Sequence, residues 1–398
     1  MEETRRLVNK IAYTPTQNFP SLSPLHRSLI PLLSFTSSIY KLALLSRHHL
    51  YNLGFFTKHK LPVPVISVGN LSWGGNGKTP MVQFLAIWFH QIGITPLVLT
   101  RGYGGGDEAT MLKRHLLSTT SARIGVGANR FATAACIFKQ QGYRNSAWTE
   151  SPKHDSELRS SVDKIGVVLL DDGMQHWSLY RDVDIVMVNG MKPWGNNQLL
   201  PLGPLREPVA ALKRADVVVI HHADLVAEKE LKAIEFIIRE EQDGIPIFRT
   251  SLSPSCFFEV NNCDPKLPLN VMHNLVVLCV SAIGSPDAFV RGIEKLGPLY
   301  VDRIDFSDHY IFQAKDIQMI KERLEKLHDE YGYKPVVTVT EKDYDRDPVI
   351  LKDLRPFEVL VLCSHLQILP STTYTQERFQ NSLKQLVKRK FSARYVYS

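Results

Sequence analysis

The chain has 398 residues, of which 44% are hydrophobic and 22% are charged. This is the composition of a soluble globular protein and not of a disordered chain, and the length is enough for two domains. Its net charge of +7 favours an anionic partner, but no aromatic and basic module of the nucleic-acid-binding kind is present, so nucleic acid is not an expected partner. The five cysteines show no metal-ligand spacing and are expected to be free thiols in a reducing compartment.

The N-terminal 60 residues divide into two parts. Residues 1–27 are basic and rich in Ser and Thr, which predicts either an organellar targeting segment or a disordered N-terminus. Residues 28–60 carry apolar side chains at helical spacing, with only 13 charge-free residues in a row from Ser28 to Tyr40, too few for the about 20 that span a bilayer. Flanking cations favour a helix lying in an anionic membrane interface, and the alternative is a helix packed on its own domain.

A strand-like run from Val63 to Val68 is followed by a glycine-rich turn and an apolar segment from Met81 to Phe89. Strand, glycine-rich loop and helix in this order predict a phosphate-binding P-loop, although Ser72 stands where the strict motif has its first glycine. The expected nucleotide-binding residues are Gly74, Gly75, Asn76, Gly77, Lys78 and Thr79. Lys78 supplies a cation and Thr79 a hydroxyl for Mg²⁺. A tight strand-to-helix turn is the alternative.

After this loop, β-rich runs alternate with helical segments, which predicts parallel strands with crossover helices. The expected strands are 96–100, 165–170, 184–188, 217–220, 275–280, 336–339 and 359–362, and the expected helices are 81–92, 127–141, 226–241, 286–296, 314–330 and 374–390. We assign a kinase-type domain to 61–255, with a polar insert at 143–163, a linker near 251–272, and a second α/β domain to 270–398. The predicted fold is a P-loop NTPase-like, mostly parallel sheet with flanking helices, a second smaller α/β domain and an N-terminal interfacial helix.

Two carboxylate groups follow predicted strands. Asp171 and Asp172 end an apolar strand, the usual partner of a phosphate loop and a source of oxygen ligands for Mg²⁺, although paired aspartates also cap helices. Asp107 follows Arg101-Gly-Tyr-Gly-Gly-Gly, and its carboxylate can accept a proton from a substrate hydroxyl. A flexible solvent loop explains the residues around Asp107 equally well.

Polar residues in two further segments can bind or react. His309 lies beside Asp308 in Phe306-Ser-Asp-His-Tyr310, where a His next to an Asp is either a proton acceptor or a satisfied surface pair. The segment from Asn196 to Pro208 has a path fixed by prolines, and its Arg206 can bind an anion with two hydrogen bonds. We expect Asn196 and Arg206 to contact the substrate.

Together these motifs resemble the tetraacyldisaccharide 4′-kinase, or lipid A 4′-kinase, family. The resemblance rests on Val65-Ile-Ser-Val-Gly-Asn, Gly-Gly-Asn-Gly-Lys-Thr-Pro80, Arg101-Gly-Tyr-Gly, Asp171-Asp-Gly-Met-Gln-His176, Arg181-Asp182, the 195–208 segment, Phe306-Ser-Asp-His-Tyr310 and Thr340-Glu-Lys-Asp343. It covers about Ser28 to Leu369, in the family's order.

The resemblance implies a peripheral membrane enzyme that uses ATP and Mg²⁺ to phosphorylate the 4′-hydroxyl of an anionic glycolipid, a tetraacyl glucosamine disaccharide 1-phosphate, in lipid A biosynthesis. By position it makes Asp107 the catalytic base, His309 the histidine that raises its basicity, Lys78 a catalytic cation, and Asp171 and Asp172 the metal-site pair. The oligomeric state is left open.

The chain departs from the family pattern in three places. The two glycine motifs around 101–109 nearly fuse, and Ala109 replaces a proline; the insert at 143–163 and the N-terminal extension are further additions. These additions indicate a mitochondrial member of a eukaryote, the alternative location being the cytoplasmic face of a bacterial inner membrane. A P-loop nucleotide switch or assembly protein is the rival function, although the Asn-Lys-x-Asp base-reading motif is missing from Thr340-Glu-Lys-Asp343.

Overall fold

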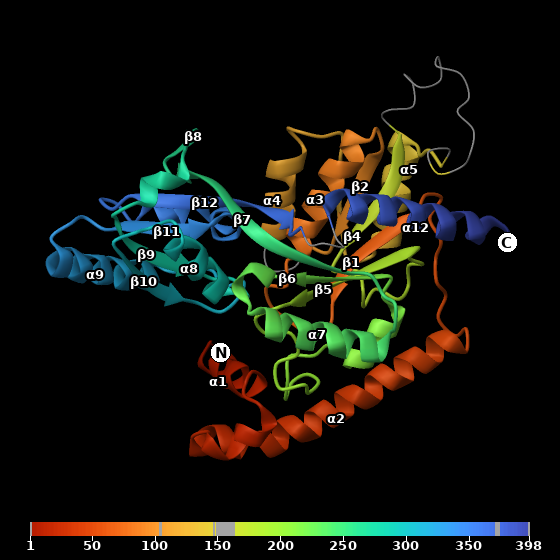
Figure 1. Ribbon diagram of the computed structural model, residues 1–398, viewed down its shortest axis with the longest axis horizontal. Coiled ribbons are helices and arrows are strands. Elements are labelled where there is room, and N and C mark those ends of the chain that lie inside the picture. Colours follow the sequence, from red (N-terminus) through yellow and green to blue (C-terminus); the bar gives the residue numbers. More distant parts are fainter. Residues whose placement is uncertain (1, 103–105, 146–147, 149–163, 371–374, 397–398) are drawn as a thin grey trace. The chain divides into compact units, whose positions relative to one another are not determined.

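The computed structural model describes residues 2–102, 106–145, 148, 164–370 and 375–396 (Figure 1). Residues 103–105 of the glycine-rich loop and most of the predicted insert at 143–163 lie outside the described residues. The chain forms two compact units, each of which is discontinuous in sequence. The first contains the residues up to 101, 115–251 and those from 368 on, and the second contains 102–114 and 252–367.

The first unit is built on a parallel sheet with the strand order β7-β6-β5-β1-β4-β2-β3. Its central strands are apolar and buried along their whole length, as a sheet covered on both faces requires. The bounds are β1 Val65–Asn70, β2 Thr95–Thr100, β3 Arg123–Val126, β4 Ile165–Asp171, β5 Val183–Asn189, β6 Val217–His221 and β7 Ile247–Glu259, of which β7 continues into the second unit.

Helices flank this sheet and bury apolar residues against it: α3 Lys78–Gln91, α5 Arg130–Gln141, α7 Glu228–Glu241 and α12 Gln376–Val396. The unit also contains α1 Glu2–Ala12 and α2 Pro24–Asn52, and the short 3₁₀ turns η1 Thr16–Ser21, η3 Val209–Arg214 and η4 Ala223–Leu225. In the segment 1–27, expected to be a targeting segment or disordered, the structure has α1, η1 and the start of α2. Residues 2–12 form α1, whose Ile11 and Ala12 are fully buried because they pack on the 195–203 loop.

The second unit is a smaller α/β structure with parallel strands in the order β10-β9-β11-β12. Its elements are α4 Asp107–Leu116, whose last two residues lie in the first unit, β8 Asn262–Leu267, η5 Leu269–Met272, β9 Val276–Ser281, α8 Pro286–Glu294, β10 Tyr300–Asp305, α9 Ala314–Tyr331, β11 Val336–Thr340, α10 Glu341–Arg346, α11 Pro348–Lys352 and β12 Val359–Ile368. A mostly parallel sheet with flanking helices and a second smaller α/β unit confirm the predicted fold class.

The segment near 251–272, predicted to be a linker, is instead largely β-strand. The end of β7 pairs with β8 in antiparallel register, Phe257 opposite Leu267. Pro254 and Pro265 misled the prediction, since proline is tolerated on edge strands and at irregular pairings. The assigned domain ranges, 61–255 and 270–398, differ from the two units because residues 102–114 belong to the second unit and those from 368 on to the first.

Candidate active site

The phosphate loop connects β1 to α3, and its glycines adopt backbone conformations that other residues avoid. Gly74 has φ of 81° and Gly77, the N-cap of α3, has φ of 78°. Asn76 is buried, and its side-chain nitrogen donates to the carbonyl oxygens of Ser72, at 3.2 Å, and Gly74. The side chain of Asn76 therefore stabilises the loop through hydrogen bonds to the loop's own backbone. The first backbone amides of α3 can then bind an anion.

Lys78, in the first turn of α3, lies beside Asp172 at the end of β4. Its Nζ is 3.7 Å from Asp172 Oδ1, and Nη1 of Arg206 donates to Asp172 Oδ1 at 2.7 Å and Oδ2 at 2.9 Å. Burial opposes the charge of Asp172, but Lys78 and Arg206 outweigh it and lower the pKa of this carboxyl to about 2. The anion that Arg206 binds in the structure is thus Asp172, and a contact with substrate stays a prediction.

Thr79 and Asp171, which respectively follow Lys78 and precede Asp172 in the sequence, also contact each other. The Thr79 hydroxyl donates to Asp171 Oδ2 at 3.2 Å, and both side chains are buried. A hydroxyl and a carboxylate are the oxygen ligands that Mg²⁺ takes beside phosphates and water, so Thr79 and Asp171 fit this ion. Asp172 is engaged by Arg206 and fits less well. No group of three or more His, Cys, Asp or Glu suited to a metal occurs in the part of the chain that the structure describes.

The structure adds a cation that sequence reasoning missed. Arg130, from α5, is buried, and its Nη2 donates to the backbone oxygen of Asp171 at 2.9 Å, while its Nη1 lies 3.4 Å from His176 Nδ1. Burial and the charges of Arg130 and Arg181 lower the pKa of His176 to about 4, so this imidazole is neutral at physiological pH. An arginine at the start of a helix carries no sequence signal that would place it here.

The loop from 195 to 208 carries the two expected substrate contacts, and Asn196 turns inward. Its Nδ2 donates to the backbone oxygens of Ile11 at 3.2 Å and Leu202 at 2.9 Å, and its Oδ1 accepts from the amide of Gln198 at 3.0 Å. These bonds make Asn196 a support for the loop. Its neighbours Asn197 and Gln198 instead line a pocket of about 470 Å³.

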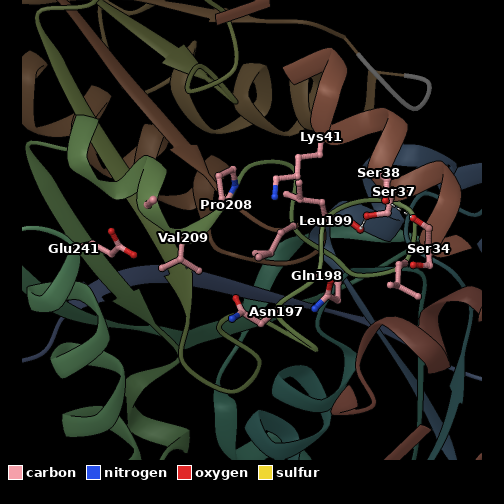
Figure 2. A pocket seen from close by; sticks show the side chains of 13 residues that line it. Ser34, Ser37, Ser38, Lys41, Asn197, Gln198, Leu199, Pro208, Val209 and Glu241 are labelled. Atoms are coloured by element: carbon pink, nitrogen blue, oxygen red, sulfur yellow. Dashed lines mark hydrogen bonds between the residues drawn. The ribbon is translucent and has the colours of Figure 1, made fainter. Parts of the chain in front are cut away.

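Figure 2 shows this pocket, which lies within the first unit between α2, the 197–199 loop and η3. Three serines, Ser34, Ser37 and Ser38, and Lys41 line its α2 side, so the walls are polar as well as apolar. The hydroxyl of Ser37 donates to the backbone oxygen of Leu199 at 3.0 Å. The pocket therefore lies at the interface between α2 and the loop that carries Arg206.

Helix α2 has one polar, anchored face and one exposed apolar face. Tyr40 donates to the backbone oxygen of Arg206 at 2.9 Å and Arg47 to that of Gln175 at 2.8 Å. The exposed stripe, which we call the apolar stripe of α2, consists of Leu25, Leu32, Phe35, Ile39, Leu42 and Leu45. Phe35 is 67% and Leu42 65% exposed, so α2 packs on its own unit along one face and leaves the apolar stripe exposed.

By length and composition alone α2 can also cross a membrane, because this helix of 29 residues contains an apolar stretch of 18 residues with at most two charged side chains. The sequence prediction had counted only the 13-residue charge-free run. The bonds of Ser37, Tyr40 and Arg47 to the protein nevertheless hold one side of the helix on the first unit. A helix with one side held and the other apolar suits the surface of a bilayer better than its interior.

Asp107 and His309, 202 residues apart, meet inside the second unit. Asp107 begins α4 and is buried, and Nδ1 of His309 lies 3.1 Å from its Oδ2. Arg346, also buried, donates to the same oxygen at 2.9 Å. Burial alone would raise the pKa of Asp107, but the hydrogen bond from His309, the charge of Lys342 and the bond from Arg346 lower it to about 2. In this structure His309 therefore lowers the basicity of Asp107, whereas the resemblance implied that it raises it.

Lys342 completes this group from α10. Its Nζ lies 3.1 Å from Asp308 Oδ1 and 3.3 Å from Nε2 of His309. Burial disfavours the ammonium charge, but Asp308, Glu108 and Asp107 raise the pKa of Lys342, so it stays protonated and donates. With Nε2 accepting from Lys342, a neutral His309 carries its proton on Nδ1 and donates it to Asp107.

The structure therefore gathers the predicted residues into two groups. Within the first unit it brings together Lys78, Thr79, Asp171, Asp172 and Arg206, and within the second it joins Asp107 to His309. A phosphate loop with a lysine and a carboxylate that can act as a base both occur in sites that transfer a phosphoryl group to a hydroxyl.

Comparison with known proteins identifies the family. The model of the family "Tetraacyldisaccharide-1-P 4′-kinase" matches residues 29–387. "Probable tetraacyldisaccharide 4′-kinase, mitochondrial" of Arabidopsis thaliana is 51% identical over 98% of this chain and 99% of that protein. A tetraacyldisaccharide 4′-kinase of Halothermothrix orenii is 31% identical over 80% of this chain and 84% of that one.

A solved structure of LpxK from Aquifex aeolicus in complex with ATP has the same fold. Its TM-score is 0.57 at 24% identity, and the match covers 92% of this chain and 99% of that one. The long sequence matches and this shared fold agree with the motifs of the chain. The chain belongs to the tetraacyldisaccharide-1-phosphate 4′-kinase family.

Proposed function

We propose that this protein is an ATP-dependent lipid kinase that transfers the γ-phosphoryl group to the 4′-hydroxyl of a tetraacyl glucosamine disaccharide 1-phosphate. The observation that carries the proposal is the contact of the buried Asp107 carboxylate with His309, at 3.1 Å, in a chain that also has a phosphate loop. Membership of the family and the length of the match support the same substrate class.

In this mechanism Asp107 accepts the proton of the attacking hydroxyl. Oδ2 is held by His309 and Arg346, and Oδ1 accepts the amide of Glu108 at 2.9 Å, which leaves a lone pair of Oδ1 for the proton. The sugar O–H bond breaks as the new O–P bond forms, and the electron pair of the breaking P–O bond stays on ADP. Because a carboxylate of pKa about 2 is a weak base, it takes the proton late, once bonding to phosphorus has made the hydroxyl acidic.

Lys78 and the loop amides are proposed to hold the phosphates and to stabilise the charge on the transferring group. Thr79 and Asp171 are the residues that would hold Mg²⁺, and the bound ion supplies positive charge to the phosphate oxygens. Asp172 orients the side chains of Lys78 and Arg206 through its ion pairs with them. Its proposed role is therefore indirect, since it positions these two cations.

We place the enzyme on a membrane through α2. The apolar stripe of α2 is the part that would enter the lipid, and Lys41, Arg47 and Lys58 supply cations near it. A location at a mitochondrial membrane is supported by the Arabidopsis relative, whose name includes this compartment.

The experiment that tests the proposal measures transfer of phosphate from radiolabelled ATP to the purified tetraacyl disaccharide 1-phosphate in detergent micelles. The variants Lys78→Ala and Asp107→Ala are assayed beside the wild type. Transfer by the wild type and its collapse in both variants are expected. Transfer that survives in Asp107→Ala would remove Asp107 from the mechanism. Steady ATP or GTP hydrolysis without transfer to lipid would instead favour the nucleotide switch.

A further inference from the structure

Three residues on adjacent strands form a row beside the phosphate loop: Asn189 ends β5, His221 ends β6, and Thr250 is the fourth residue of β7. Asn189 of β5 is paired in register with His221 of β6, and His221 is paired with Thr250 of β7. The three strands are parallel neighbours in the sheet (Figure 1). Because the three residues are paired in register, their side chains point to the same face of the sheet. All three are buried. We name Asn189, His221 and Thr250 the row.

The imidazole of His221 lies directly against Gly77, the last glycine of the loop. A Cβ atom built on Gly77 would be 2.5 Å from Cδ2 and 2.7 Å from Nε2 of His221, closer than nonbonded atoms approach. The ring therefore occupies the space that a side chain at 77 would need. It also limits how far the Gly77 backbone, at φ of 78°, can move before α3 begins at Lys78.

The other two members of the row fix this arrangement from either side. Nδ1 of His221 lies 3.0 Å from the hydroxyl of Thr250, which sets the tilt of the ring. Asn189 donates from Nδ2 to the backbone oxygen of Gly75 at 3.1 Å. The loop is thus supported at Gly75 by a hydrogen bond and at Gly77 by a ring.

We propose that His221 is a positioning residue that, with Asn189, holds residues 75–77 in the conformation that binds the phosphates of ATP. The proposal rests on the nucleotide role of the loop and adds residues that its sequence motif does not contain. The ring acts by contact and not by charge. Burial and the neighbouring His222 lower the pKa of His221 well below its ordinary value, so the ring is neutral at physiological pH.

A buried histidine that only fills the core is the competing explanation, and ATP affinity separates the two. ATP binding to the full-length protein is measured by isothermal titration calorimetry with Mg²⁺ and without lipid, alongside the melting temperature. We expect His221→Ala to weaken ATP binding about tenfold or more, since small misplacements of binding groups are costly. His221→Phe keeps a ring against Gly77 and should recover most of the affinity.

Two further variants allow the positioning role to be tested even if His221→Ala is poorly folded. Asn189→Asp keeps an oxygen for the amide of Met191 but loses the donor to Gly75, and it should weaken ATP binding as well. His222→Asn is the matched control: His222 has φ of 59°, which asparagine tolerates, and its ring packs on that of His221, with 4.0 Å between the centroids, but is not among the atoms nearest to Gly77. This control should bind ATP as the wild type does.

Unchanged ATP affinity in folded His221→Ala and Asn189→Asp, with only a lower melting temperature, would overturn the positioning role and leave the kinase proposal standing. A wild type that binds no ATP would instead remove the proposed function together with this inference. Equal losses in His222→Asn and His221→Ala would also contradict the assignment, because the effect would then not depend on the Gly77 contact.

Discussion

Nη2 of Arg346 lies 2.9 Å from Oδ2 of Asp107, the carboxylate oxygen that Nδ1 of His309 also contacts at 3.1 Å. Arg346 is additionally bound to Asp343 and to the backbone oxygens of Tyr310 and Ala282, so its guanidinium is fixed on several sides. A fixed cation on one oxygen of the carboxylate orients the other and lowers its basicity.

Replacement of Arg346 by Met should therefore raise the pKa of Asp107 and lower kcat. Opposite charges within hydrogen-bond distance change a carboxyl pKa by about 1–3 units, so the acid limb of the pH–rate profile should move to higher pH. The measurements are kcat and kcat/KM for the lipid between about pH 2.5 and pH 8, because a pKa of about 2 raised by about 1–3 units lies at about 3–5. Arg323→Met, which removes an arginine bonded to Asp302 elsewhere in the second unit, is the control. A variant profile that overlays the wild type would contradict this coupling.

The acid stability of the protein should depend on Asp107. Its pKa is lowered in the folded state from 3.8 to about 2, so its ionised form stabilises the fold above about pH 4. That contribution should be lost as pH falls from about 4 towards 2. Urea unfolding of the wild type and Asp107→Asn across this window measures it. The difference in unfolding free energy between the two proteins should shrink as pH falls; a constant difference would count against the assigned shift.

Asp172 and Arg206 should behave as one unit. Because Arg206 donates to both carboxylate oxygens, Asp172→Asn and Arg206→Met each break the same pair, and their effects on kcat/KM should not add. A coupling energy of about 0.5–3 kcal/mol is expected from a double-mutant cycle. Additive losses, with the Arg206 variant changing only the KM for lipid, would show that Arg206 contacts the substrate instead.

The hydroxyl of Thr79 should set the Mg²⁺ requirement. Thr79→Ser keeps the donor to Asp171, whereas Thr79→Val replaces it with a methyl group of similar size. We expect the Val variant to need about tenfold more Mg²⁺ for half-maximal activity, and the Ser variant to resemble the wild type, because only an oxygen can ligate the ion. Identical Mg²⁺ titrations for both variants would exclude Thr79 from the metal site.

The apolar stripe of α2 should carry the affinity for membranes. Phe35→Ser and Leu42→Ser together remove two large exposed side chains, each worth about 1.5–3 kcal/mol when fully buried in an apolar phase. Sedimentation with anionic vesicles should then fall by at least about tenfold. Val349→Ser, at an apolar position of the second unit that is 68% exposed, is the control. Equal sedimentation of all proteins would refute the membrane role.

The strands that sequence reasoning located best are the apolar, fully buried ones. Residues 165–170 and 217–220 were each extended by one residue in the structure, because a strand covered on both faces leaves a continuous apolar run. In contrast, β3, β7, β8 and β10 were missed. β3 has only four residues, and β10, Tyr300–Asp305, is partly exposed and has a polar sequence. β7 and β8 contain prolines of the segment that was predicted to be a linker.

The site was predicted as far as its local motifs extend. The phosphate loop follows β1, and Asp171 and Asp172 lie at the end of β4. The carboxyl ends of parallel strands lie at the same edge of the sheet, so the sequence predicts that these residues are close together. Arg346 lies one helical turn beyond the Thr340–Asp343 motif, and Arg130 and His221 reach the site only through packing of distant segments. Contacts of this kind depend on tertiary structure, so no local pattern marks them.

Because α2 is bonded to the loops of Arg206 and Gln175, the proposed contact of α2 with a bilayer would act on these loops. If membrane contact shifts α2 toward the geometry in which these loops bind ligand, thermodynamic reciprocity requires ligand binding to tighten membrane attachment by the same factor. The enzyme would then stay bound to the bilayer longest while its ligands are bound, and it would dissociate from the bilayer after turnover.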